Sequence, residues 1–238
     1  MGVTQPHIPT EVHLDFLGMT FQAHWNYHAI LMVAVWFVLV PICIVIIRFG
    51  KPKPTLTGLH RQVAVKHIEW WWFSVHKYGL MFSVGLALAG AIVAVTVSGG
   101  ISGSLHSMFG LATIALGCLQ IMGGWLRGKH GGKNYYSAVA DDPNTWFGDH
   151  YNMTKRRRIF EAYHKTAGYF VYFFAAGAVA SGLMQYPMPG LGWFIVSMVL
   201  LAFFVSIVLE YKGFRYDGYR AAHGHTMDAP FNKEREFL

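Results

Sequence analysis

Five long runs of apolar residues, separated by short or polar segments, dominate the chain. They cover residues 26–47, 73–97, 105–126, 162–184 and 191–209, and none of them contains Asp, Glu or Arg. A helix needs about 20 apolar residues to cross a bilayer. Strands of a transmembrane barrel would instead alternate apolar and polar residues over about ten positions. The pattern therefore predicts an all-α membrane protein with five transmembrane helices, the first four of which form a four-helix bundle.

Composition and charge agree with this prediction and add an orientation. Hydrophobic residues make up 54% of the 238 residues, charged residues only 13%, and the mean hydropathy is +0.34. With five spans, one membrane face carries residues 1–25, 98–104 and 185–190, and the other carries residues 48–72, 127–161 and 211–238. When residues inside the spans are counted with the nearest end, all 19 Lys and Arg residues belong to the second face, together with ten of the 12 acidic residues. Glu11 and Asp15 are the acidic residues of the first face.

This asymmetry favours a membrane function over binding of nucleic acid, although the net charge is +7. Cytoplasmic loops of membrane proteins carry an excess of Lys and Arg. The N-terminus is therefore expected outside and the C-terminus in the cytoplasm. The basic run at residues 155–158 is expected to meet anionic lipid head groups of the bilayer.

Four histidines lie near the starts of the first four apolar runs: His28, His76, His106 and His164. A histidine inside a membrane span is costly and usually functional. Because successive spans alternate in direction, His28 and His106 should lie toward the outer face and the other two toward the inner face. The two levels would be roughly 20 Å apart. Diagonal helices of a four-helix bundle can clamp a flat macrocycle with an imidazole on each side, which predicts two haem groups.

Small residues follow these histidines at helical spacing. After His106, a stripe that includes Gly110 and Gly117 recurs every three or four residues, the spacing of one helix face. Similar stripes occur in the second and fourth spans. Taken alone, such a stripe is more typical of close helix packing, which needs no cofactor. With a histidine heading each stripe, we interpret it as room for a cofactor. His24, four residues before His28, could compete as a ligand; we expect it to be an interfacial residue.

Over about residues 25–184 the chain resembles the cytochrome b561 family, in its bacterial and domain-fused branches. The resemblance rests on four segments: HAILMVAVWFVLVPICIVIIRFG from His28, WWFSVHKYGLMFSVGLALAG around His76, LHSMFGLATIALGCLQIMGGWLRG around His106 and FEAYHKTAGYFVYFFAAGAVASGL around His164. It implies a transmembrane electron carrier with two non-covalent b-type haems, held by His28 with His106 and by His76 with His164. It also implies a bacterial inner-membrane protein, with a quinol, ascorbate or similar small reductant on one side and a ferric chelate or redox protein on the other.

Lys and Arg residues are distributed unevenly between the two expected haem sites. The outer segments contain no Lys or Arg, so propionates of the outer haem would lack a cationic partner within this chain. Four residues are candidates to pair with the inner propionates: Lys77, Arg127, Arg158 and Lys165. The short outer turns leave a flat surface on which a redox partner protein could dock.

The expected organisation is an outer segment (1–25), a haem core (26–184), a fifth helix (185–209) and a cytoplasmic tail (210–238). Two other functions stay open. The chain could be a haem-bearing anchor subunit that links a docked dehydrogenase to quinone, or a haem-free structural subunit of a membrane complex. Whether an electron-transfer cytochrome of this kind is itself a transmembrane oxidoreductase subunit stays open too. The chain has no Gly-rich phosphate-binding loop.

Overall fold

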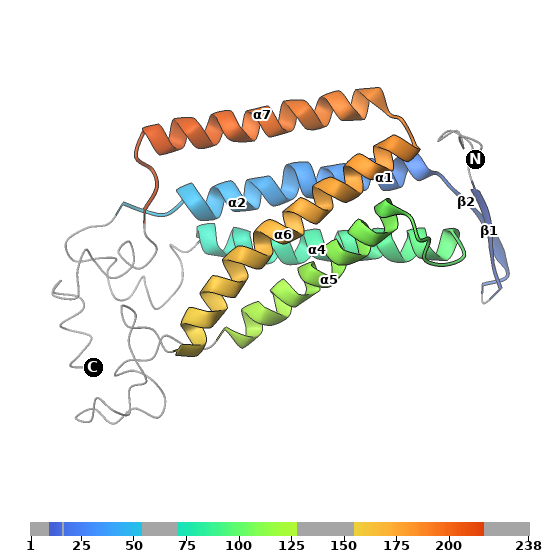
Figure 1. The fold of residues 1–238 in the computed structure, drawn as a ribbon, viewed down its shortest axis with the longest axis horizontal. Coiled ribbons are helices and arrows are strands. Elements are labelled where there is room, and N and C mark those ends of the chain that lie inside the picture. The colour runs from blue at the N-terminus through green and yellow to red at the C-terminus, as the bar shows by residue number, and fades with distance from the viewer. Residues whose placement is uncertain (1–9, 16, 54–70, 128–154, 217–238) are drawn as a thin grey trace. The chain divides into compact units, whose positions relative to one another are not determined.

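The computed structural model describes residues 10–15, 17–53, 71–127 and 155–216. In chain order its elements are β1 (Thr10–Leu14), β2 (Met19–Ala23), α1 (Trp25–Ala34), η1 (Val35–Leu39), α2 (Val40–Phe49), α4 (Trp71–Val97), α5 (Leu105–Leu126), α6 (Lys155–Gln185) and α7 (Pro189–Tyr211) (Figure 1). The tail beyond residue 216 and the greater part of the connection between α5 and α6 lie outside the described residues.

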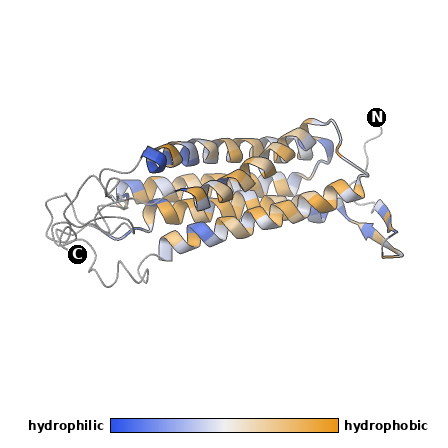
Figure 2. Ribbon diagram, turned by 90° about the horizontal axis from the view of Figure 1, so that it is seen from below, coloured by the Kyte–Doolittle hydropathy of each residue, from blue (hydrophilic) through white to orange (hydrophobic). Residues whose placement is uncertain are grey.

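Five helices are long and apolar enough to cross a membrane: Trp25–Phe49, which joins α1, η1 and α2, and then α4, α5, α6 and α7. Hydrophobic residues run along the length of each of them (Figure 2). The expectation of a mostly helical chain with five membrane-length helices is confirmed. Four of the five helices begin and end within three residues of the predicted bounds.

Helix α6 begins at Lys155, seven residues before the predicted start of its apolar run. The added turns are polar but well suited to a helix. Arg157 Nε donates to Glu161 Oε1 at 3.2 Å, and Lys165 Nζ lies 3.7 Å from Glu161 Oε2. Both pairs are four residues apart, the spacing at which side chains meet on a helix. Hydropathy detects the apolar part of a helix and misses this polar extension.

The first long helix changes its winding before Pro41. Residues Val35–Leu39 form a π-helical turn, and α2 continues through Pro41. Proline has no N–H and therefore cannot bond to the carbonyl group four residues earlier. Short π-helical segments inside an α-helix accommodate such interruptions. The structure thus places the disturbance of the helix in the turn before Pro41.

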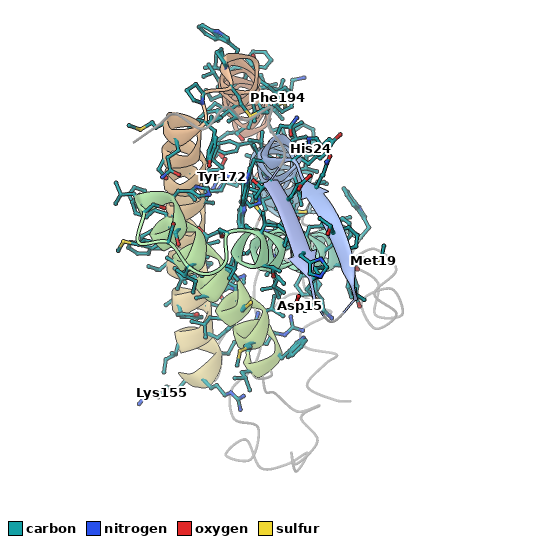
Figure 3. All side chains as sticks on the ribbon, turned by 90° about the vertical axis from the view of Figure 1, so that its right-hand side faces the viewer. Asp15, Met19, His24, Lys155, Tyr172 and Phe194 are labelled. Atoms are coloured by element: carbon teal, nitrogen blue, oxygen red, sulfur yellow. The ribbon has the colours of Figure 1, made fainter. Side chains whose placement is uncertain are left out.

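A β-hairpin precedes the first helix, and the sequence analysis did not anticipate it. Strands β1 and β2 pair antiparallel from Thr10↔Ala23 to Leu14↔Met19. Gly18 takes a φ of 59° in the turn, a conformation that glycine adopts without strain. Figure 3 shows Asp15 and Met19 at the turn end of the hairpin. The all-α description therefore holds for the membrane-length helices but leaves out the strands Thr10–Leu14 and Met19–Ala23.

The described chain forms two compact units, each built from segments of several helices. The first unit contains Met1–Ile42, Gly79–Gln120 and Ala167–Phe203, and the second contains Cys43–Tyr78, Ile121–Thr166 and Phe204–Leu238. The long helices contribute segments to both units. His28 and His106 belong to the first unit, and His76 and His164 belong to the second.

The core of the first unit combines bulky residues of η1 with small residues of α4 and α6. Val35 and Ala87 are fully buried, and Ala175 is almost so. Residues Leu191, Ile195 and Val199 of α7 pack against this core, although no residue of α7 is itself buried. Alanines on α4 and α6 let the helices approach closely, as is common between membrane helices.

The second unit has a smaller buried core, to which Cys43, Phe49 and Trp72 contribute. In this unit α7 is held to α2 by an ion pair in which Arg48 Nη2 donates to Glu210 Oε2 at 3.0 Å. Arg215 Nη1 donates to the other oxygen of Glu210 at the same distance.

Candidate functional site

The first unit contains a pair of facing histidines. His28 lies in the first turn of α1, and His106 is the second residue of α5. Their ring centroids are 6.1 Å apart, and the ring planes are inclined at 82°. Both side chains are partly buried. Two helices that are not adjacent in the sequence thus direct one imidazole each to the same place.

A backbone carbonyl group next to His106 fixes which of its ring nitrogens carries a proton. Its Nδ1 lies 2.8 Å from the carbonyl oxygen of Ala178 in α6. A carbonyl oxygen can only accept a hydrogen bond, so Nδ1 must carry the proton. The neutral ring then keeps the lone pair of Nε2 free to bind a metal, the arrangement that commonly orients histidine ligands. On the opposite helix, the ring of His28 interacts with the backbone of Gly90.

Two glycines make room for these rings. A Cβ atom at Gly182 in α6 would lie 2.9 Å from Nδ1 and 3.0 Å from Cε1 of His106, closer than real side chains approach. A Cβ atom at Gly90 in α4 would collide with the Cε of Met32 and would lie 3.9 Å from Nδ1 of His28. Each imidazole of this pair is therefore bordered by a glycine of another helix.

The second unit contains a pair of nearly the same geometry. The ring centroids of His76 in α4 and His164 in α6 are 6.2 Å apart, with an interplanar angle of 80°. Phe160 stacks on His164 with ring centroids 5.1 Å apart and an angle of 26°. His76 interacts with the backbone of Cys43, although its buried Nδ1 lacks a hydrogen bond of normal length within the described residues.

The separation of the rings suits two ligands on opposite sides of one metal ion. An imidazole nitrogen binds a transition metal at about 2.0 Å. The centre of a five-membered ring with bonds of about 1.33 Å lies about 1.1 Å behind that nitrogen. Two imidazoles in line through one ion should therefore have centroids about 6.2 Å apart. Both pairs, at 6.1 and 6.2 Å, match this value.

A bare ion would need more protein ligands than two. In the described part of the chain, no group of three or more His, Cys, Asp or Glu side chains is arranged to hold a metal ion. Two facing imidazoles suffice where a flat macrocycle supplies the remaining ligands, as in haem with two axial histidines. The donor set at each pair therefore fits haem better than a metal held by the protein alone.

The structure distributes the four predicted cationic residues unevenly. Lys77 is exposed and lies over the ring of Tyr78, its neighbour in sequence, at 4.8 Å. The side chain of Lys165 is 75% exposed. Arg127 lies over the ring of Phe73, with its Cζ 5.3 Å from the ring centroid. The side chain of Arg158 lies outside the described part of the structure.

Arg157 is a site residue that the sequence analysis did not single out. Its side chain is only 12% exposed, its Nη1 atom is buried, and its Cζ lies 5.2 Å from the centroid of Phe160. Phe160 in turn stacks on His164. The spacing Arg157, Phe160, His164 follows one helix face at steps of three and four residues. That spacing is visible in the sequence, but it points to the site only once α6 is known to begin at Lys155.

The predicted glycines of α5 lie in different surroundings. No described atom lies within 4 Å of a Cβ atom built on Gly110, four residues after His106. At Gly117 a Cβ atom would lie 3.3 Å from Cγ2 of Val84, so this glycine allows close packing of α5 on α4. His24, the competing ligand, packs instead on Tyr27, with ring centroids 5.5 Å apart.

No protein-family model, no curated protein and no solved structure matches this chain.

Proposed function

We propose that this chain is a transmembrane electron-transfer cytochrome of the b561 type that binds two b-type haems. His28 and His106 are the axial ligands of one haem, and His76 and His164 are the ligands of the other. The observation that carries the proposal is the repeated geometry of the two pairs, with centroids 6.1 and 6.2 Å apart on membrane-length helices. The resemblance of the four histidine-bearing segments to cytochrome b561 supports it.

The side chains of each pair serve to hold and orient the cofactor. Haem supplies an iron that takes up and releases one electron at a time. Each histidine pair would hold such an iron with two imidazoles, which would favour electron transfer over binding of a small substrate at the iron. The hydrogen bond from His106 to Ala178 fixes the ring orientation before the cofactor binds.

The proposed setting is the bacterial inner membrane, with the N-terminus outside and the C-terminus in the cytoplasm. A quinol or another small reductant would exchange electrons at one face and a redox partner protein at the other. The role of anchor subunit for a docked dehydrogenase uses the same two haems and differs only in its partners. A haem-free structural role explains the packing of Gly117 on Val84 but not the facing imidazoles.

Absorbance of the purified protein tests the proposal. We expect two haems per chain and a reduced-minus-oxidised α-band typical of b-type haem. His106→Leu should remove one haem and His164→Leu the other, whereas His24→Leu should keep both, because His24 packs on Tyr27 outside the pair. A colourless protein after expression with ample iron and haem would overturn the proposal, as would retention of both haems in His106→Leu.

A further inference from the structure

The two histidine pairs differ in the charged groups around them. Within the described residues, His106 is the one titratable side chain that interacts electrostatically with His28. The segments assigned to this end of the helices, residues 1–25, 98–104 and 185–190, contain no Lys or Arg in the full sequence. No Lys or Arg of the described residues is therefore found to act on the His28–His106 pair.

Cations gather at the other pair. Arg157, Lys165 and Glu161 act on His164, and Lys51 acts on His76. Arg127 lies over Phe73, which precedes His76 by about one helical turn. Glu161 is the one anion in this group, and it pairs with both Arg157 and Lys165. Among the residues that the structure describes, the charges around this pair therefore sum to a clear positive excess.

Arg157 is the cation best placed to act on the pair. Its guanidinium carbon lies 5.2 Å from the centroid of Phe160, which lies 5.1 Å from the centroid of His164. From these two distances, the guanidinium carbon lies no more than about 10 Å from the ring centroid of His164. Because the side chain is only 12% exposed, salt and water screen its charge less than that of Lys165.

A fixed positive charge stabilises a nearby iron that gains an electron. The interaction grows as the distance and the effective dielectric constant fall. For a unit charge about 12 Å from the iron, which would lie beyond the ring of His164, and an effective dielectric constant of about 20, the ratio of reduced to oxidised iron changes roughly tenfold. For a one-electron couple this corresponds to about 59 mV.

We propose that the haem held by His76 and His164 has the higher reduction potential, and that Arg157 is a main residue that sets it. Electrons then pass downhill from the His28–His106 end to the His76–His164 end. This inference rests on the proposed function and adds to it the direction of transfer. Arg157 acts through its charge on the haem and does not bind the iron.

Redox titration of the purified protein, followed at the α-band, tests the order of the potentials. His164→Leu leaves the His28–His106 haem, and His106→Leu leaves the other. We expect the midpoint potential of the haem retained in His106→Leu to be higher. If either variant fails to fold, the two steps of the wild-type titration serve instead. A protein without haem contradicts the proposed function, whereas two haems of equal or inverted potential contradict only this inference.

Substitutions on α6 test the role of Arg157. Arg157→Gln should lower the midpoint potential of the His76–His164 haem by about 59 mV, a tenfold change in its ratio of reduced to oxidised iron. The midpoint potential of the His28–His106 haem should stay unchanged. Arg157→Lys should largely preserve the midpoint potential of the His76–His164 haem, and Glu161→Gln should raise it. The matched control is Arg156→Gln, because Arg156 is exposed and donates to the carbonyl of Leu126. Equal shifts in Arg156→Gln and Arg157→Gln, or a fall in Glu161→Gln, would overturn the assignment.

Discussion

The space beside His106 offers a sharp test of the geometry, because a single methyl group should disturb it. In Gly182→Ala the new Cβ atom would lie 2.9 Å from Nδ1 of His106 if nothing moved. The ring must therefore shift, and its hydrogen bond to the carbonyl of Ala178 must lengthen or break. We expect the variant to lose the haem of the His28–His106 pair selectively.

The free energy by which Gly182→Ala weakens haem binding can be worked out from two unfavourable contributions and one favourable one. Overpacking a well-packed site costs about 1–3 kcal/mol, and loss of one hydrogen bond costs about 1 kcal/mol. Alanine in place of glycine within a helix returns about 1 kcal/mol. The net loss of about 1–3 kcal/mol lies in the range by which disturbed second-shell contacts weaken metal binding, about 10–100-fold.

The assay is haem content after purification, together with titration of haem into protein prepared without it. Gly85→Ala is the matched control, because a Cβ atom on this helical glycine meets no described atom within 4 Å. It should bind both haems as the wild type does. Wild-type affinity at both sites in Gly182→Ala would refute the placement of His106 against α6. A loss confined to the other haem would refute the pairing.

Two further predictions concern the ring planes and the hairpin. The planes within each pair are inclined at 82° and 80°, and nearly perpendicular imidazoles leave two iron d orbitals close in energy. The ferric protein should therefore give strongly anisotropic low-spin electron paramagnetic resonance signals; ordinary rhombic signals alone would indicate parallel rings. Trp25 Nε1 donates to Thr10 Oγ1 at 3.0 Å, so Trp25→Phe should speed limited proteolysis within residues 10–23. Unchanged cleavage would show that this bond does not hold the hairpin.

The sequence predicts the membrane-length helices well because a bilayer imposes a simple rule on length and polarity. It predicts helix ends less well. The start of α6 is stabilised by Glu161 and its cationic partners, which hydropathy counts against a span. The hairpin at residues 10–23 was missed because its strands are only five residues long and stand next to a much stronger helical signal.

The sequence locates the four histidines but not the groups that support them. His28, His76, His106 and His164 stand out because polar side chains are rare in apolar runs. The carbonyl of Ala178 and the space at Gly182 depend on how α6 packs against α5, which no local pattern contains. The basic run at the start of α6 is expected to meet lipid, whereas the structure turns Arg157 inward onto Phe160.

The separation of the facing rings argues against histidines that merely satisfy one another. A direct hydrogen bond between two imidazole nitrogens needs about 2.9 Å between them. In-line rings joined by such a bond would have centroids about 5.1 Å apart. The His28–His106 separation of 6.1 Å is about 1 Å longer. Nδ1 of His106 is already bonded to the carbonyl of Ala178, so Nε2 is the nitrogen left for a ligand shared with His28. The separation of the ring centroids suits a bridging ion better than a shared proton. Burial of such a pair without a ligand would cost about 1–3 kcal/mol for each unsatisfied nitrogen, and a shared metal centre removes that cost.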